Sequence, residues 1–250
     1  MPEGKDGKPP YYEFSNFHKQ VLLPITVYFD IESILRKIHS CSPDDKDSCT
    51  ERYQKHIPSG YNIVFKSTDD KVFKPELHKY TMKSDDDYVM GKFIKDIESS
   101  VKRFWNTIDF NKDFDGITLE EYYTATKCWV CKGKLNGDKV KDHDHFTGRY
   151  RGPAHNKCNL LLRMPPVITM FSHNLSGYDA YLFIEALANT PGEITCIPRN
   201  DENYISLSKK ITAGTYINKH GEEKDRKVEI RFLDSYRSMD DSLSNLVSNQ

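Results

Sequence analysis

The chain has 250 residues, 37% of them hydrophobic and 29% charged, which is typical of a globular protein with a polar surface. Its 36 Lys and Arg residues are balanced by 37 Asp and Glu residues, so the net charge of −1 favours no class of partner. No apolar run approaches the roughly 18 residues of a membrane-spanning helix and the N-terminus is too polar for a signal peptide, which predicts an intracellular protein, nuclear or cytoplasmic, that is neither secreted nor membrane-bound.

The first half of the chain is predicted to contain strands and one long helix. Residues 1–20 are rich in Lys, Gly, Pro and Tyr and are expected to form a flexible arm. Runs of apolar, β-branched and aromatic residues predict strands at Val21–Ile31, Gly60–Phe65 and Leu77–Met82. Between Asp85 and Ile108 apolar residues recur every three or four positions, which is typical of an amphipathic helix. These elements predict the open sheet of an α/β fold.

The second half continues the same pattern. A strand is predicted at Val167–Asn174, followed by a helix at Tyr178–Ala188 that ends before Pro191 and Gly192. The segments EITCIP, YISLS and VEIRFLDS predict three more strands, and a short helix begins near Asp240. We therefore expect one α/β domain in two parts, residues 21–126 and 164–250, interrupted by an insert at residues 127–163.

The insert has the spacing of a zinc site. Cys128 and Cys131 form one pair, His155 and Cys158 form a second, and 23 residues separate the two pairs. Four sulfur and nitrogen ligands in two pairs are typical of a closed tetrahedral zinc site, which stabilises lobes too small to build a core. The insert therefore predicts one structural Zn²⁺.

A dense cluster of acidic and imidazole side chains lies between the two pairs. Asp142 and His143 are followed by Asp144 and His145 in the run DHDH. Such a cluster can hold a divalent ion and offer an imidazole that activates water for attack on a phosphodiester. The alternative is a solvated hairpin whose His and Asp residues pack the zinc lobe.

The insert resembles the recombination endonuclease VII family, a zinc-stapled ββα-metal nuclease, in its CxxC, DHDH, TGxYRG and closing CN motifs. The resemblance implies that Asp142 and Asn159 hold a catalytic divalent ion and that His143 is the base. His155 stands where the family has cysteine. Residues 127–163 contain 9 Lys and Arg against 3 Asp and Glu, a net charge of +6, so phosphate contact is expected here, from Arg149 and Arg151 in particular.

Two carboxylate motifs flank the insert. Asp30 and Glu32 are two positions apart at the end of a predicted strand, so they share one face of it. Asp179 closes the motif Asn174-Leu-Ser-Gly-Tyr178-Asp179, which also follows a strand and precedes a helix. Three such carboxylates can hold two metal ions that activate water and stabilise the leaving 3′ oxygen in phosphodiester hydrolysis.

These motifs resemble the first two exonuclease motifs of family B DNA polymerases, most closely the protein-primed enzymes of Polinton/Maverick transposons, viruses and linear plasmids. The segments IPSGYNI, the CxxC lobe, YRGPAHNKCNL, HNLSGYD, FLDSYRSM and SLSNLV follow the N-terminal part of those enzymes in order over residues 20–250. The resemblance implies a ribonuclease-H-like 3′–5′ exonuclease fold. It also implies a third exonuclease motif and a polymerase palm beyond Gln250.

The same resemblance implies roles for individual residues. Asp30, Glu32 and Asp179 would bind Mg²⁺ or Mn²⁺, and a second set would hold the frayed 3′ end of the DNA: Ser33, Asn174, Tyr178, Ser235 and Tyr236. Tyr236 departs from the family, which usually has leucine there. An aromatic side chain such as Tyr178 can stack on an unpaired base of any sequence.

The sequence thus predicts an N-terminal fragment of a protein-primed DNA polymerase that carries proofreading motifs and a DNA-binding zinc lobe. Its expected partners are single-stranded 3′ ends, primer-template DNA and a terminal priming protein. The third exonuclease motif and the polymerase palm are expected beyond Gln250, so the sequence does not decide whether residues 1–250 are themselves an enzyme. Two alternatives remain: an endonuclease centred on His143 and Asn159, and a zinc-containing DNA-binding module without catalytic activity.

Overall fold

The computed structural model describes residues 23–38, 54–108, 119–200, 204–218 and 220–249. The chain divides into two compact units. The first, which we call the sheet domain, comprises Pro24–Ile108 and Pro166–Gln250. The second, which we call the Cys/His lobe, takes in Asp109–Pro165 and so begins well before the predicted insert at residue 127.

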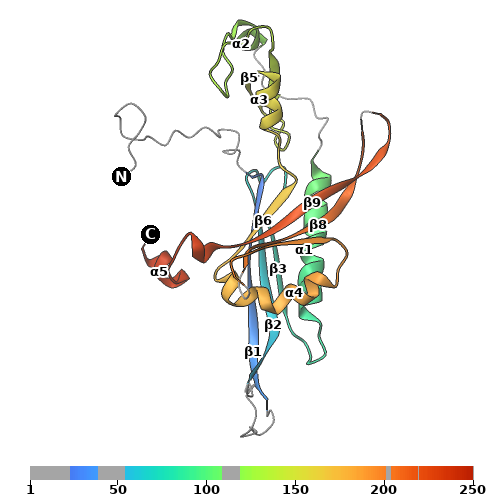
Figure 1. The fold of residues 1–250 in the computed structure, drawn as a ribbon, viewed down its shortest axis with the longest axis vertical. Coiled ribbons are helices and arrows are strands. Elements are labelled where there is room, and N and C mark those ends of the chain that lie inside the picture. Colours follow the sequence, from blue (N-terminus) through green and yellow to red (C-terminus); the bar gives the residue numbers. More distant parts are fainter. Residues whose placement is uncertain (1–22, 39–53, 109–118, 201–203, 219, 250) are drawn as a thin grey trace. The chain divides into compact units, whose positions relative to one another are not determined.

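The sheet domain is built on one seven-stranded mixed sheet (Figure 1). The strand order is β3-β2-β1-β6-β9-β8-β7, in which β1, β6 and β9 are parallel neighbours and the other pairs are antiparallel. The strands, in chain order, are β1 (Ile25–Lys37), β2 (Gln54–Ser67), β3 (Glu76–Thr81), β6 (Val167–Ser172), β7 (Glu193–Pro198), β8 (Tyr204–Ile217) and β9 (Glu223–Asp234). The predicted α/β class is therefore confirmed at the level of a large mixed sheet with few helices.

Several strands are longer than the sequence predicts. The strand expected to end at Ile31 continues to Lys37, and the strand expected at Gly60–Phe65 begins at Gln54. The added residues are mostly polar and exposed, and they are held by backbone pairing between β1 and β2. Hydrophobic periodicity reports burial, so it does not detect a ribbon of two strands that extends past the core.

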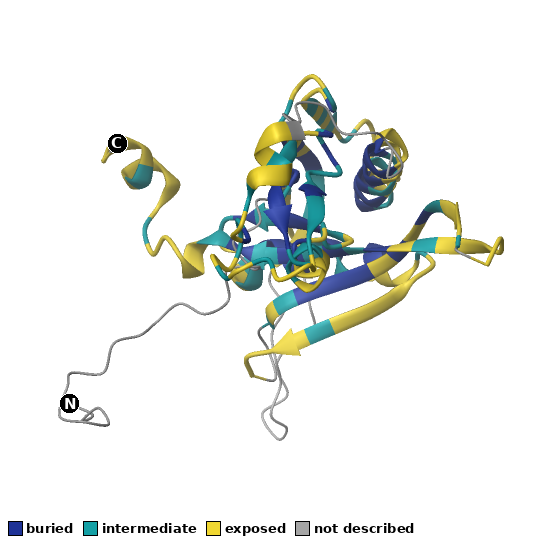
Figure 2. Ribbon diagram, turned by 90° about the horizontal axis from the view of Figure 1, so that it is seen from above, coloured by how far each residue is buried: buried dark blue, intermediate teal, exposed yellow. Residues whose placement is uncertain are grey.

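Two helices cover one face of the sheet. They are α1 (Val89–Thr107) and α4 (Ala180–Ala188), and both contact the aromatic centre of the core. Phe29, Phe93, Phe183 and Phe232 lie there with ring centroids 5.1–6.0 Å apart. Figure 2 shows that buried residues line the strands and the inner side of α1, as the predicted amphipathic pattern requires.

The opposite side of β1 is exposed. Burial alternates along the strand, with Phe29 and Ile31 buried and Asp30 and Glu32 exposed. This alternation confirms that the two carboxylates share one face of β1. A bulge at Glu32 and Ser33 then shifts the register with β2, a feature that is frequent beside active sites.

The Cys/His lobe is small. It contains α2 (Leu119–Thr124), the antiparallel pair β4 (Val140–His143) and β5 (Tyr150–Ala154), and α3 (Asn156–Leu161). Lys139 ties α2 to the hairpin, because its Nζ donates to the backbone carbonyls of Tyr122, Tyr123 and Ala125 at 2.8–3.2 Å. The chain ends in the sheet domain with a 3₁₀ turn, Ser235–Arg237, and α5 (Leu243–Ser248). None of the described helices is long and apolar enough to cross a membrane.

We expect Phe93→Ala to lower the free energy of unfolding of the sheet domain by about 3–5 kcal/mol, because Phe93 is fully buried between Phe29, Tyr61 and Phe183. Urea denaturation followed by circular dichroism measures this loss. Lys95→Ala on the exposed side of α1 is the control and should change stability by less than about 0.5 kcal/mol. An equally small effect of Phe93→Ala would contradict the packing described here.

Candidate functional site

The candidate site lies where the parallel strands end. Because β1, β6 and β9 run in the same direction, their carboxyl ends meet at one edge of the sheet, which is where ligands bind in open α/β sheets. Ser172 ends β6 and is paired with Asp234, which ends β9. Asp30 follows Tyr28, the last residue of β1 that pairs with β6. All carboxylates of the site come from this edge.

A tight turn connects β6 to α4. Asn174 has φ = 64°, in the left-handed region that few residues other than glycine adopt, and a π-helical turn, Leu175–Asp179, follows. A Cβ atom on Gly177 would clash with the Asn174 Oδ1 atom. A side chain at position 177 would therefore require the Asn174 side chain to move. Asn174 is exposed, and its side chain, predicted to hold a DNA end, packs over Gly177 in the structure.

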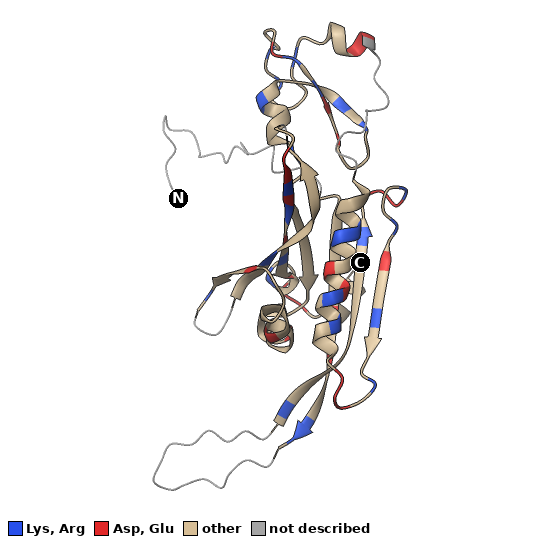
Figure 3. Cartoon of the chain, turned by 90° about the vertical axis from the view of Figure 1, so that its right-hand side faces the viewer, with Lys and Arg blue, Asp and Glu red and all other residues tan. Residues whose placement is uncertain are grey.

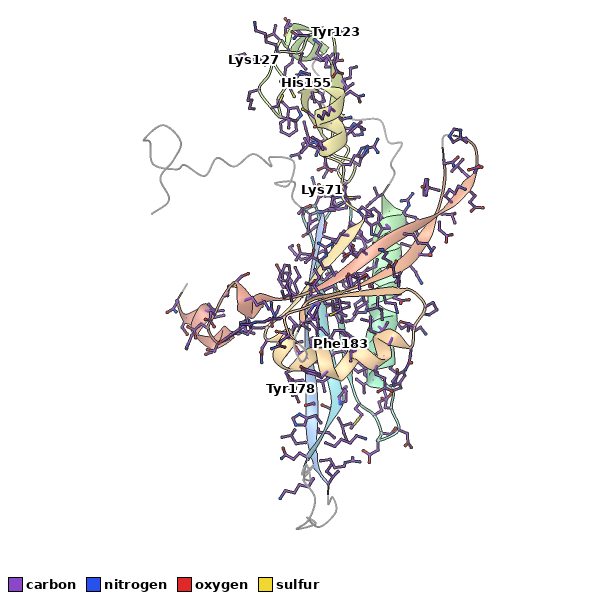
Figure 4. The ribbon with its side chains drawn as sticks, in the orientation of Figure 1. Lys71, Tyr123, Lys127, His155, Tyr178 and Phe183 are labelled. Carbon is purple, nitrogen blue, oxygen red and sulfur yellow. The ribbon has the colours of Figure 1, made fainter. Side chains whose placement is uncertain are left out.

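The turn positions Tyr178 beside β1. The Tyr178 hydroxyl forms a hydrogen bond with Ser33 Oγ, 145 positions away in the chain, and lies 2.7 Å from His56 Nδ1. The ring of His56 also packs edge-on against Tyr178, with centroids 5.4 Å apart. Figure 4 shows Tyr178 beside β1, below the inward-pointing Phe183 of α4. Ser33 and Tyr178, predicted to act together, are thus neighbours.

His56 was not among the predicted residues. It lies at the start of β2, in the polar stretch that sequence patterning leaves without an element, and its partner is 122 positions away. Its pairing with Leu35 on β1 fixes its position beside the site. No signal in the local sequence distinguishes it from the other exposed residues around it.

Asp179 is the buried carboxylate of the site. Only 4% of its surface is exposed, and Ser172 Oγ donates a hydrogen bond to its Oδ2. Burial raises the pKa of Asp179 to about 6. The hydrogen bond from Ser172 opposes this shift, and the negative charges of Asp30, Asp234 and Glu32 each add to it to a smaller extent. Asp30, Asp234 and Glu32 therefore each lie within electrostatic range of Asp179.

Asp234 is a second buried acid that the sequence analysis missed. Its Oδ2 accepts hydrogen bonds from the backbone N–H of Ser176 at 3.0 Å and from Ser176 Oγ at 2.6 Å, and its Oδ1 accepts one from the N–H of Tyr236 at 3.0 Å. Burial disfavours its charge, but these donors outweigh burial and lower the pKa of Asp234. Asp234 thereby ties the turn after β6 to the end of β9. The sequence does contain one indication of this role, because Asp234 ends a predicted strand in the segment FLDS.

Ser235 and Tyr236 lie beside the end of β6. His173 Nε2 donates to the backbone carbonyl of Asp241 at 2.9 Å, and His173 Nδ1 lies 3.1 Å from Ser235 Oγ. The rings of His173 and Tyr236 pack edge-on with centroids 5.3 Å apart, and 42% of Tyr236 is exposed. Both predicted residues are therefore held at the same edge of the sheet as Asp179.

The Cys/His lobe contains the clearest metal site. Cys128 Sγ, Cys131 Sγ, Cys158 Sγ and one nitrogen of His155 lie within 4.8 Å of one another, as the predicted spacing requires. His155 Nε2 donates to the carbonyl of Lys134 at 2.9 Å, which leaves Nδ1 to face the sulfur atoms. Three thiols and an imidazole can hold a metal ion such as zinc. Within the described ranges no other group of His, Cys, Asp or Glu side chains converges in this way, so Asp30, Glu32 and Asp179 are neighbours without forming a ready-made metal cage.

The predicted catalytic residues of the lobe have other partners. Asp142 is fully buried and accepts two hydrogen bonds from the Arg151 guanidinium, at 2.9 and 2.8 Å, and one from Trp129 Nε1 at 2.9 Å. Both oxygens of Asp142 are thus used within the lobe, and Arg151, predicted to contact phosphate, is held by Asp142. The geometry therefore favours a structural role for the ion pair between Asp142 and Arg151.

The other predicted residues of the lobe are distributed around this pair. His143 ends β4, and its ring lies 4.5 Å from that of His145. Burial lowers the pKa of His145, with the neighbouring charge of His143 acting in the same direction. Asn159 lies on α3, one residue after Cys158, and Arg149 is exposed just before β5.

No protein-family model matches this chain, and no curated protein or solved structure matches it significantly. The interpretation of the site therefore depends on its own residues and their geometry.

We expect the purified protein to contain one zinc ion per chain and Cys158→Ser to reduce this content well below one, because the mutation removes one of four converging ligands. Inductively coupled plasma mass spectrometry measures the content. Cys196→Ser on β7 of the sheet domain, which is not one of the four converging residues, is the matched control and should retain the metal. A zinc content unchanged by Cys158→Ser would contradict the assignment.

We also expect Asp179→Asn to stabilise the metal-free sheet domain at pH 7.5 by about 1–3 kcal/mol. The folded-state pKa of about 6 lies above the unfolded value near 4, so the charged carboxylate destabilises the fold fully above pH 6 and not at all below about pH 4. The gain from Asp179→Asn should therefore shrink as the pH falls from 6 to 4. Urea denaturation at pH 7.5, 6 and 4 measures it, and a gain that does not change with pH would contradict this explanation.

Proposed function

We propose that the sheet domain is a metal-dependent 3′–5′ exonuclease domain and that the chain is the N-terminal part of a protein-primed family B DNA polymerase, acting in the replication of a mobile element or virus. One observation carries the proposal: the segments around Asp30 and Asp179, far apart in sequence, meet through the Ser33–Tyr178 hydrogen bond and the electrostatic coupling of their carboxylates. Packing of the core alone does not require polar residues of these kinds to meet.

The topology of the sheet supports a ribonuclease-H-like fold, which the proposed exonuclease function implies. An antiparallel set, β3-β2-β1, is continued by two parallel strands, β6 and β9, and the crossing helices α1 and α4 lie against one face. This arrangement leaves the part of β1 just past its pairing with β6, with its two exposed acids, beside the turn that carries Asp179.

The donor set of the site fits a hard divalent cation. Asp30, Glu32 and Asp179 offer carboxylate oxygens, which Mg²⁺ and Mn²⁺ prefer. Burial and, to a smaller extent, the neighbouring negative charges disfavour the ionised form of Asp179, and a bound cation would offset both. Bound there, Mg²⁺ would supply activation of water and stabilisation of the leaving 3′ oxygen.

The residues around the carboxylates suit the frayed end of a DNA strand. Tyr178 presents an aromatic ring and a hydroxyl held by Ser33 and His56, so its orientation is fixed before a base stacks on it. Asn174 and Tyr236 are exposed on the same edge, and Ser235 is held beside them. We assign these side chains to binding of the terminal nucleotides.

We assign the Cys/His lobe to DNA binding around one structural zinc ion. The charge of +6 over residues 127–163 supports contact with phosphates, and exposed Arg149 is a candidate for it. The commitment of both Asp142 oxygens to Arg151 and Trp129 favours this assignment over an endonuclease centre, which would need Asp142 for its metal ion. Primer-template DNA and a terminal priming protein are the partners that this proposal implies.

The protein should shorten a 5′-labelled single-stranded oligonucleotide from its 3′ end in the presence of Mg²⁺ or Mn²⁺. Asp30→Asn should slow this digestion by about 100-fold or more, because it removes a metal-binding carboxylate. Denaturing gel electrophoresis separates the products, and binding of Mn²⁺ by electron paramagnetic resonance should weaken in the same variant. His143→Ala is the control and should keep wild-type digestion.

The opposite pattern would overturn the assignment. Internal cleavage that is lost in His143→Ala and retained in Asp30→Asn would indicate an endonuclease in the lobe. DNA binding and stoichiometric zinc, without digestion and without Mn²⁺ binding at Asp30, would indicate a DNA-binding module with no catalytic activity.

A further inference from the structure

The strands β1 and β2 continue past the candidate site as a two-stranded ribbon. β6 pairs with β1 only at Thr26–Tyr28, and β3 pairs with β2 only at Gly60–Phe65. Beyond the bulge at Glu32 and Ser33, residues 34–37 therefore pair with residues 54–57 alone. We call these eight residues the β1–β2 arm. With a rise of about 3.3 Å per residue it is about 13 Å long.

The arm carries positive charge and no negative charge. Arg36, Lys37 and Lys55 are exposed, and none of the eight residues is Asp or Glu. Figure 3 shows Lys and Arg on both strands of this ribbon. Arg36 also has an ion pair with Asp85 at 2.8 Å, but both partners are well exposed, so the pair contributes little.

The register makes this charge unfavourable in the free protein. Arg36 lies directly opposite Lys55 in the antiparallel pair, and like charges at such positions destabilise a sheet. A ribbon of two strands is itself only marginally stable in water. No core depends on these side chains, and an anionic ligand along the ribbon would offset their repulsion.

The arm begins at the residues that hold Tyr178. Ser33 directly precedes it on β1, and His56, within it, contacts both the hydroxyl and the ring of Tyr178. Leu35 pairs with His56, so the next pair, Arg36 and Lys55, lies one step further from the carboxylates. Successive pairs alternate between the two faces of the ribbon, so Lys37 shares the face of His56, and Arg36 and Lys55 lie on the other. A polymer whose end is held at Tyr178 would pass Lys37 directly and reach the other two cations across the narrow ribbon.

We propose that the β1–β2 arm binds the phosphates of single-stranded DNA upstream of the terminal nucleotide, with His56 as the residue that positions Tyr178 between the arm and the carboxylates. This inference rests on the proposed exonuclease function and names its substrate contact. A flexible single strand fits a narrow ribbon with exposed apolar Leu35 and cationic Lys37 and Lys55, because it offers both bases and phosphates.

The test is equilibrium binding of a fluorescein-labelled oligothymidylate by fluorescence anisotropy, without added divalent metal and in an Asp30→Asn background that prevents digestion. Lys37→Ala combined with Lys55→Ala should weaken binding by about 5- to 20-fold near 0.1 M salt. The slope of log Kd against log salt concentration should fall by about 1.4, since each phosphate contact on a single strand contributes about 0.7. Replacement of both lysines by arginine should preserve affinity and slope.

The matched control is Lys71→Ala combined with Lys74→Ala, which removes the same charge from exposed positions just beyond the other end of β2. This control should change the affinity by less than twofold. An unchanged affinity and salt slope in the Lys37 and Lys55 variant would overturn the proposal, as would an equal loss in the control. His56→Ala should weaken binding without changing the salt slope, which separates its contact with Tyr178 from a phosphate contact.

The binding test of the arm and the digestion test of the exonuclease can fail separately. Loss of binding in the arm variant of a protein that never digests DNA would support the arm and refute the exonuclease. Digestion by the wild-type protein together with unchanged binding in the arm variant would refute the arm and leave the exonuclease in place.

Discussion

The parallel alignment of β1, β6 and β9 is the constraint on which the candidate site depends. Parallel neighbours run toward the same edge of the sheet. Asp30 and Glu32, just past the part of β1 that pairs with β6, and Asp234, which ends β9, therefore lie beside the turn that follows β6. The long antiparallel pairs on both sides, together with the aromatic core under α1 and α4, hold these three strands in register. The directions of the strands therefore determine which side chains meet at the site.

The turn after β6 shows how the fold maintains an unfavourable charge. Asp179 is buried and repelled by neighbouring acids, which costs stability whenever it is ionised. The turn is nevertheless held by the left-handed Asn174, whose side chain packs over Gly177, and by the hydrogen bonds from Ser176 to Asp234. Such strain and charge are typical of functional sites, where stability is given up for reactivity.

The Cys/His lobe solves a different physical problem. Its helices and strands have four to six residues each, too short to bury a large core, and four metal ligands take over that role. The ion pair between buried Asp142 and half-buried Arg151, completed by Trp129, organises the hairpin beside the ligands. Residues that resemble a nuclease motif in sequence can thus serve the architecture of the lobe, because the same carboxylate cannot satisfy an arginine fork and a metal ion with the same lone pairs.

The sequence by itself determined the elements whose signal is local. The spacing of Cys128, Cys131, His155 and Cys158 predicted the ligand group, the apolar repeat predicted α1, and the two-residue step predicted that Asp30 and Glu32 share a face. Only the tertiary structure decided the partners of distant residues: His56 with Tyr178, Asp234 with Ser176, and the extension of β1 and β2 beyond the core. The physical reason is that periodicity and ligand spacing act over a few residues, whereas these contacts join segments through backbone pairing and burial, which no short stretch of sequence contains.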